Sequence, residues 1–88
     1  MSSFHGTTIN TTVNKLIKAI GEPDEENNSG EDKTNFDWYN LTLAGHKVTV
    51  YDWKEYRRIS KDEIIEWHIG GESEKETYEA KQELQKLL

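Results

Sequence analysis

Apolar residues near the start of the chain recur with a helical period and predict a short amphipathic helix. They stand at i, i+3, i+4 and i+7: Val13, Leu16, Ile17 and Ile20. This spacing places the four side chains on one helix face. Thr11 is the expected N-cap, because a threonine hydroxyl can accept a backbone N–H of the first turn. Gly21 and Pro23 are expected to end the helix, since glycine takes a left-handed conformation there and proline cannot continue it.

The stretch from Asn35 to Trp53 alternates between apolar and polar residues around Ala44-Gly45, which predicts a β-hairpin. A two-residue turn places Leu43 opposite His46. The same register predicts two cross-strand pairs on the core side, Leu41 with Val48 and Tyr39 with Val50. It predicts two more on the other side, Trp38 with Tyr51 and Phe36 with Trp53. The hairpin is therefore expected to carry an aromatic face directed away from the core.

A second alternating stretch, Glu63 to Ile69, predicts a third strand, and Gly70-Gly71 is expected to end it. The segment from Phe4 to Ile9 is a candidate fourth strand. Ser73 and Glu76 have the spacing of a capping box, so a second helix is expected from there to the C-terminus. Its inner face is predicted to hold Thr77, Ala80, Leu84, Leu87 and Leu88.

Together these elements predict an α+β fold in two layers. The expected order is a short N-terminal helix, a three-stranded or four-stranded antiparallel sheet, and a C-terminal helix. Helices on one side leave the other face of the sheet uncovered. The 88 residues suffice for one domain, 1–88. Residues 22–33 combine turn formers with six acids and predict a flexible acidic loop.

The charge balance limits the classes of partner. The chain has 17 Asp and Glu against 11 Lys and Arg, a formal charge of −6. This argues against direct nucleic-acid binding and against an anionic membrane surface, because both favour positive charge. The excess lies in residues 22–32, which hold six acids and no base, so the rest of the chain is balanced. No segment has the roughly 20 apolar residues of a membrane span, and no export signal is visible, so a cytoplasmic protein is expected.

The residues that usually carry chemistry give no indication of an enzyme. Cysteine is absent, which excludes disulfides and thiolate ligands. His5, His46 and His68 lack the spacing of a metal site, so neither a metal nor a cofactor is expected. Asp52 and His68 could meet across adjacent strands, but no nucleophile motif accompanies them. A structural contact is the expected reason for such a pair, and we expect no enzymatic activity.

The predicted aromatic face would expose more apolar surface than monomers usually tolerate. It is formed by Phe36, Trp38, Tyr51, Trp53 and, from the third strand, His68. The N-terminal segment or the C-terminal helix could cover it as a second core, or copies of the chain could associate through it. The third alternative is a ligand or partner surface, because flat rings stack on nucleobases and anchor protein interfaces.

A basic segment begins directly after Trp53. Its cations are Lys54, Arg57, Arg58 and Lys61. Cations beside stacked rings fit a phosphorylated ligand that carries a base, because arginine can grip phosphate with two parallel hydrogen bonds. The alternative is a solvated loop that pairs with the protein's own acids. Gly70-Gly71 could offer backbone amides to an anion, with a simple end of the strand as the alternative.

Several short motifs resemble those of small, mostly uncharacterised tailed-phage accessory proteins. They are Tyr51-Asp52-Trp53-Lys54, Trp67-His68-Ile69-Gly70-Gly71, His5-Gly6-Thr7, the turn from Leu16 to Pro23, and Asp32-Lys33. The resemblance spans most of the chain, and the acidic segment from Asp24 to Glu31 departs from it. It implies a phage gene product that acts in the cytoplasm of an infected bacterial host cell. Such proteins commonly act by binding, either to a host defence protein or to a nucleotide signal.

Two functional hypotheses follow. The first is a non-enzymatic, homo-oligomeric anti-defence protein that sequesters a small phosphorylated ligand such as a cyclic nucleotide. Its binding residues are expected to be Trp38, Tyr51, Trp53, Lys54, Arg57, Arg58, His68, Gly70 and Gly71. The second is an inhibitor of a host defence nuclease, of the anti-CRISPR type, that binds its target protein through the aromatic face and the acidic loop.

Overall fold

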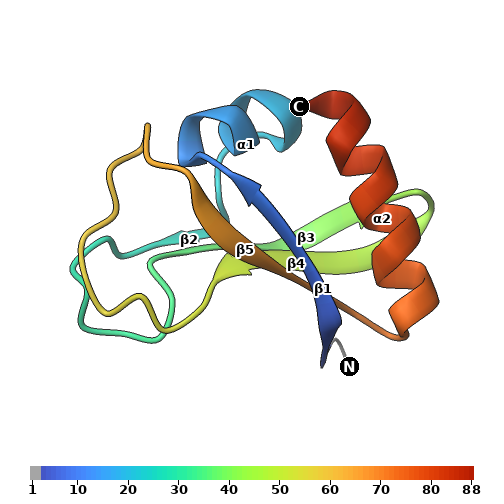
Figure 1. The fold of residues 1–88 in the computed structure, drawn as a ribbon, viewed down its shortest axis with the longest axis horizontal. Helices are drawn as coiled ribbons and strands as arrows, with labels where there is room; N and C mark the ends of the chain where they lie inside the picture. Colours follow the sequence, from blue (N-terminus) through green and yellow to red (C-terminus); the bar gives the residue numbers. More distant parts are fainter. Residues whose placement is uncertain (1–2) are drawn as a thin grey trace.

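The computed structural model describes residues 3–88, which form a five-stranded antiparallel sheet and two helices (Figure 1). The elements in chain order are β1 (Ser3–Thr11), α1 (Val13–Ile20), β2 (Glu25–Glu26), β3 (Phe36–Leu43), β4 (His46–Asp52), β5 (Ile65–Gly71) and α2 (Glu74–Leu87). The strands lie side by side in the order β1-β5-β4-β3-β2. The first strand in the chain is therefore paired with the last one.

Both helices lie on one side of the sheet, as Figure 1 shows. The core fills the space between them, and its fully buried apolar residues include Val13, Leu16, Phe36, Val50, Trp67, Ile69, Ala80 and Leu84. Within residues 3–88 no helix covers the opposite side of the sheet, which we call the open face. No helix in this range is long and apolar enough to cross a membrane.

The predicted α+β class is confirmed, but the sheet has five strands rather than three or four. The candidate strand at Phe4 to Ile9 is part of β1, a longer strand that precedes the first helix. β2 lies inside the segment predicted as a loop; Glu25-Glu26 has no apolar residue, so no sequence pattern marks it.

The first helix covers the predicted residues, but Thr12 rather than Thr11 caps it. The Thr12 hydroxyl accepts the N–H of Lys15 at 3.1 Å.

The predicted hairpin register is correct near the turn and wrong beyond it. The confirmed pairs are Leu43 with His46 and Leu41 with Val48. A β-bulge between Trp38 and Leu41 then adds one residue to β3, so that Trp38 lies opposite Val50. The predicted pairs that do not form are Tyr39 with Val50, Trp38 with Tyr51, and Phe36 with Trp53. A shift of one residue moves every following side chain to the other face of the sheet.

An acidic side chain holds the bulge in place. Asp24 Oδ2 accepts the backbone N–H groups of Tyr39 at 2.8 Å and of Asn40 at 2.9 Å. A bulge leaves such groups without a partner on the neighbouring strand, and here one carboxylate satisfies both. The hydrogen bond from the Asn40 backbone is the largest reason that the pKa of Asp24 lies below its ordinary value.

The bulge sends two aromatic residues into the core. Phe36 is fully buried, and Trp38 is 2% exposed. The indole N–H of Trp38 donates to the carbonyl of Gly21 at 2.8 Å, and its ring meets the Trp67 ring edge to face at 5.7 Å. Tyr39 takes the outward position instead and is 48% exposed. The aromatic face predicted from β3 therefore does not exist.

A buried carboxylate joins the end of β4 to the start of β3. Asp52 is fully buried and accepts the backbone N–H groups of Asn35 and Phe36, each at 2.8 Å. The side-chain amide of Asn35 also donates to Asp52, at 3.2 Å. Asn35 in turn donates to the carbonyl of Arg57 at 2.9 Å and accepts the N–H of Gly30 at 3.1 Å. Two long loops are thereby fixed to one buried centre.

β5 includes both glycines of Gly70-Gly71 and ends at Gly71, so the predicted end of the strand is correct to within two residues. Both positions lie too close to neighbouring atoms for a side chain. An added Cβ would lie 2.9 Å from Thr49 Oγ1 at Gly70 and 2.8 Å from Thr77 Cγ2 at Gly71. The two glycines therefore allow the close approach of neighbouring elements to β5.

The second helix begins as predicted. Ser73 is its N-cap and accepts the N–H of Glu76 at 3.2 Å. Its buried side chains are Thr77, Ala80 and Leu84. Leu87 and Leu88, expected on the inner face, are 51% and 40% exposed, because the end of α2 lies beside α1 and away from the strands (Figure 1).

Replacing the buried carboxylate with an amide tests its role. In Asp52→Asn the remaining amide oxygen can still accept the N–H groups of Asn35 and Phe36, but the new N–H₂ group then faces the side-chain N–H₂ of Asn35, and the negative charge that strengthened all these hydrogen bonds is lost. We expect the free energy of unfolding to fall by about 2–4 kcal/mol, since charged hydrogen bonds and unsatisfied buried groups act on that scale. Urea unfolding followed by tryptophan fluorescence measures this. The control Glu31→Gln, at an exposed position, should change it by less than about 0.5 kcal/mol; equally small effects would contradict the prediction.

Candidate functional site

Four rings lie together on the open face: Phe4 from β1, His68 from β5, Tyr51 from β4 and Trp53 from the segment after β4. We call this group the aromatic strip. The rings of Phe4 and His68 stack, with centroids 3.9 Å apart and planes 11° apart. Tyr51 meets His68 edge to face at 5.4 Å. The Trp53 ring lies 6.0 Å from Tyr51 and 6.2 Å from His68.

The register of the strands explains why these residues share one face. Tyr51 on β4 lies opposite His68 on β5. Trp53 follows Tyr51 by two residues and so points to the same side. Phe4 lies opposite Gly70, which adds no side chain to the open face. The ring of Phe4 is therefore free to cover His68.

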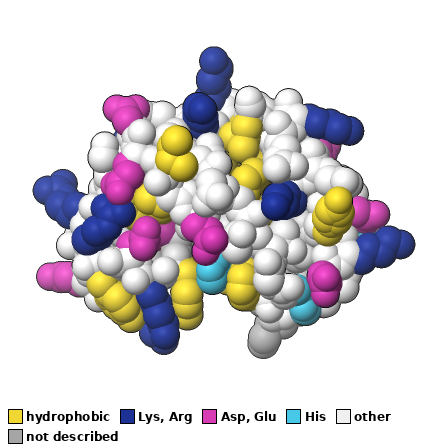
Figure 2. Space-filling view, viewed as in Figure 1, with side chains coloured by type: hydrophobic (Ala, Val, Ile, Leu, Met, Phe, Trp, Pro, Cys, Tyr) yellow, Lys and Arg dark blue, Asp and Glu magenta, His cyan; other side chains and the backbone are white. Residues whose placement is uncertain are grey.

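The two outer rings of the aromatic strip are the accessible ones. Phe4 is 43% exposed and Trp53 is 40% exposed, whereas Tyr51 and His68 are half-buried between them. Figure 2 shows hydrophobic side chains gathered along the border of the molecule opposite the helices, with a histidine between them. A flat ligand would therefore meet bare aromatic surface on this side.

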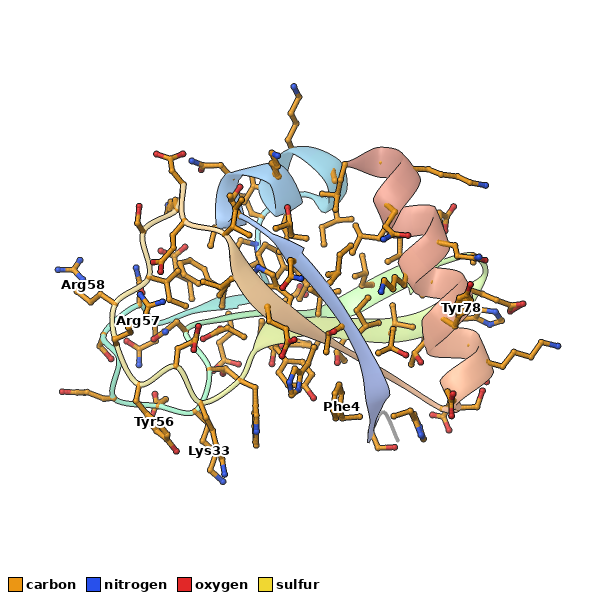
Figure 3. The ribbon with its side chains drawn as sticks, viewed as in Figure 1. Phe4, Lys33, Tyr56, Arg57, Arg58 and Tyr78 are labelled. Atoms are coloured by element: carbon orange, nitrogen blue, oxygen red, sulfur yellow. The ribbon has the colours of Figure 1, made fainter. Side chains whose placement is uncertain are left out.

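Two lysines flank the exposed tryptophan. Lys54 Nζ lies 5.4 Å and Lys33 Nζ lies 5.8 Å from the centroid of the Trp53 ring, within the range of a cation–π interaction. The backbone N–H of Lys54 donates to the carbonyl of Lys33 at 2.7 Å, which holds their two loops together. Figure 3 shows Lys33, Tyr56 and Phe4 all pointing away from the helices. This side of the molecule thus combines aromatic rings with positive charge.

The structure brings together only some of the predicted binding residues. Those in or beside the aromatic strip are Tyr51, Trp53, Lys54 and His68. Trp38 lies in the core, because the bulge turns it inward, and cannot stack on a ligand. Gly70 and Gly71 are buried within β5 and form no open turn for an anion.

The two predicted arginines lie elsewhere. Arg57 donates to both carboxylate oxygens of Glu63, at 2.9 and 2.6 Å, which uses the fork that a phosphate would need. This hydrogen bond raises the pKa of Arg57 and lowers that of Glu63. Arg58 is exposed, and Figure 3 shows it at the end of the molecule far from Phe4.

Sequence reasoning missed Phe4 and Lys33. Phe4 had one usable signal, since it is the aromatic residue at the start of a candidate strand. Its stacking on His68 depends on the pairing of the first strand with the last, which periodicity does not reveal. No sequence signal indicated Lys33, because it reaches Trp53 only through the long loop between β2 and β3.

An acidic residue borders the aromatic strip on the β3 side. Asp37 lies opposite Tyr51, and its Oδ1 is buried with no hydrogen-bond partner among residues 3–88. Burial, together with the charges of Glu25 and Asp24, raises the pKa of Asp37 to about 6. Burial also raises the pKa of Tyr51, and the charge of Asp37 adds to this effect. Both groups therefore ionise less readily than they would in water.

The ring at the centre of the aromatic strip is neutral near pH 7. Burial lowers the pKa of His68 below its ordinary value, and the charge of Glu66 opposes this effect. The imidazole can then stack as an uncharged ring. At neutral pH the site consists of four uncharged rings, with Asp37 on one side and Lys33 and Lys54 on the other.

The described residues form neither a metal site nor the Asp52–His68 pair that the sequence allowed. Within residues 3–88 no three His, Asp or Glu side chains are grouped as a metal site. Asp52 and His68 are on adjacent strands but point to opposite faces, since Asp52 lies opposite Trp67 and Tyr51 lies opposite His68. The contact that the sequence allowed between them does not form. The arrangement as it stands can stack planar groups and attract anions.

The charge of Asp37 is expected to destabilise the fold near neutral pH. Its pKa rises from 3.8 in the unfolded chain to about 6 in the fold, so between these values the folded state holds the extra proton. Stability should therefore fall as the pH rises from about 4 to about 6. Asp37→Asn removes this loss. At pH 7.5 we expect its free energy of unfolding to exceed that of the wild type by about 1–2 kcal/mol, after allowance for partial solvent exposure.

Urea unfolding at pH 4.5 and at pH 7.5, followed by tryptophan fluorescence, measures this difference. His68 is present in both proteins, so its own titration cancels in the comparison. Glu66→Gln, an exposed neutralisation on the same face, is the control and should change stability little at either pH. The same pH dependence in Asp37→Asn and in the wild type would contradict the assignment.

Comparison with protein-family models, with curated protein sequences and with solved structures finds no match for this chain. The function is therefore inferred from the geometry of the aromatic strip and its lysines, together with the short sequence motifs.

Proposed function

We propose that the protein binds a small phosphorylated ligand with a planar base on the open face, without converting it chemically. The observation that supports this is the aromatic strip beside Lys33 and Lys54, on a sheet face that no helix of residues 3–88 covers. Rings supply stacking for the base, and the ammonium groups supply charge for the phosphate. Neither feature has a second role in the core.

The exposed rings determine where the base would lie. Trp53 and Phe4 are the accessible members of the aromatic strip, and Trp53 is the one that both lysines flank. Stacking of one base on an aromatic side chain contributes about 1–3 kcal/mol. Trp53 is therefore the expected centre of the site, and Phe4 offers a second platform for a ligand with two bases.

Lysines rather than arginines would meet the phosphate. Arg57 is already paired with Glu63 through two hydrogen bonds, and Arg58 lies at a distant end of the molecule. Lys33 and Lys54 are exposed, and their ammonium groups act as compact point charges that reorient easily. This replaces the bidentate arginine contact expected from the sequence with a looser contact of two cations.

The sequence motifs suggest the setting. The resemblance to small tailed-phage accessory proteins leads us to propose an anti-defence role in the cytoplasm of an infected bacterium. A protein that holds a ligand without converting it lowers the free concentration of that ligand. A cyclic nucleotide immune signal has the base and the phosphate that the open face would bind.

Calorimetric titration with cyclic dinucleotides, cyclic trinucleotides and cyclic ADP-ribose isomers tests this proposal. We expect binding of at least one member of the panel, and we expect Trp53→Ala to weaken it about tenfold or more through the loss of one stacking surface. Tyr78→Ala is the matched control, since Tyr78 is 51% exposed on α2 and outside the aromatic strip. Lys54→Gln should weaken binding about fivefold, whereas Lys86→Gln should not. Silence of the wild type across the panel at tens of micromolar would reject the proposal.

A specific observation favours a second candidate, an inhibitor of a host defence nuclease. Part of the acidic segment is the strand β2, paired with β3, so Glu25 and Glu26 are presented on a sheet edge and both are exposed. A fixed acidic edge is suited to a basic nucleic-acid channel, where charge complementarity steers association. The aromatic strip would then act as the apolar anchor.

Neutralising the acidic edge separates the two candidates. The variant carries Glu25→Gln, Glu26→Gln and Glu31→Gln, and keeps Asp24 because it holds the bulge. For a nuclease inhibitor we expect weaker inhibition and a smaller dependence on salt concentration. A ligand-binding protein should bind as the wild type does in calorimetry. Unchanged inhibition by this variant would eliminate the second candidate.

A further inference from the structure

One side of β1 has no partner strand. β1 spans nine residues, Ser3–Thr11, and among the described strands it pairs only with β5. Its outer N–H and C=O groups can therefore accept another strand. In Figure 1 no further element lies beyond β1 at this edge of the sheet.

The two edges of the sheet differ in their protection against such pairing. β2, at the opposite edge, has two residues and both are glutamates, so a second β2 would meet like charges. β1 contains no Asp, Glu, Lys, Arg or Pro. Its register is irregular between Phe4 and Thr8 and regular from Thr8 to Thr11. The regular part is an uncharged, unprotected template.

We infer that two copies of the chain pair through the Thr8–Thr11 part of β1, antiparallel, across a two-fold axis perpendicular to the sheet. This arrangement brings no like charges together along the strands. It also places the two acidic segments at the far ends of the joined sheet, because β2 lies at the other edge of each copy. For a chain with a formal charge of −6, this contact keeps electrostatic repulsion between the copies low.

A groove beside β1 supports a second copy as the occupant. It has a volume of about 690 Å³ and lies between residues 5–8 and the first half of α2. The α2 wall carries Tyr78, which is 51% exposed, and both signs of charge, with Glu74 near Lys75 and Lys81. Figure 3 shows Tyr78 on α2. Antiparallel pairing through Thr8–Thr11 sets this groove against the start of α1 in the second copy, so the groove leaves room for that segment.

Such pairing has a consequence for the open face. A two-fold axis perpendicular to the sheet keeps the open faces of both copies on the same side. The aromatic strip of each copy approaches the shared edge through Phe4, the member that comes from β1. If the proposed function holds, the dimer would present two base-stacking surfaces to one ligand. The pairing itself does not depend on that function.

The absence of cysteine allows a direct test by cross-linking. Thr8→Cys and Asn10→Cys are prepared separately and also mixed, since opposed residues in an antiparallel pair have Cβ atoms close enough for a disulfide. Under mild oxidation we expect a covalent dimer in at least one of the three samples. Glu26→Cys, at the opposite edge, is the control and should give no covalent dimer. No cross-link in any of the three samples would overturn the inference.

Mass measurement in solution gives an independent result. The wild type should have the mass of a dimer in native mass spectrometry and in light scattering, and Thr8→Lys with Asn10→Lys should restore the monomer by like-charge repulsion. Circular dichroism verifies that the double variant is folded. Two results would overturn edge pairing. The first is a monomeric wild type at high micromolar concentration. The second is a dimer that the Trp53→Ala variant dissociates but the lysine variant does not. Calorimetry with the panel above, on the monomeric variant, separates a failure of pairing from a failure of ligand binding.

Discussion

The arrangement of both faces of the sheet depends on the buried carboxylate of Asp52. It binds the N–H groups of Asn35 and Phe36 and so aligns the start of β3 with the end of β4. Asp52 fixes the hairpin at the start of β3, and the Ala44-Gly45 turn fixes it at the other end. The extra residue of β3 must therefore be accommodated between these two points. The bulge held by Asp24 absorbs it, and Phe36 is thereby directed into the core. Because strand side chains alternate, the inward position of Asp52 also places Tyr51 and Trp53 outward.

The local elements were predictable because each depends on neighbours in sequence. The stripe from Val13 to Ile20 and the capping pair of Ser73 and Glu76 specify their helices without help from the rest of the chain. The turn fixes the hairpin register only as far as the first irregularity. The bulge depends on a contact between Asp24 and the backbone of Tyr39, fifteen residues away. β2 likewise depends on pairing with a strand about ten residues further along the chain. The alternation of apolar and polar residues could therefore indicate neither the bulge nor β2.

The residues of the candidate site also divide into those that local sequence patterns predict and those that depend on distant contacts. Tyr51, Trp53 and His68 were predictable, because alternation on two neighbouring strands decides their side of the sheet. Phe4 was not, because it needs the pairing of the first strand with the last. Arg57 was assigned to phosphate from its position in the chain, but Glu63, six residues on, satisfies its guanidinium. The sequence pattern thus identified three of the four rings of the site, but it assigned to the site an arginine that pairs with Glu63 instead.

An acidic protein can attract an anion when its charges are separated on the surface. The strand β2, which carries Glu25 and Glu26, lies two strands from β4, a distance of about 10 Å at about 4.8 Å per strand. Exposed charges beyond a Debye length of about 8 Å are largely screened at physiological salt. Lys33 and Lys54 lie within 6 Å of the Trp53 ring and would act on a group bound there without such loss. The formal charge of −6 therefore arises from residues 22–32, whereas two lysines flank Trp53 and one carboxyl group, Asp37, borders the strip at Tyr51.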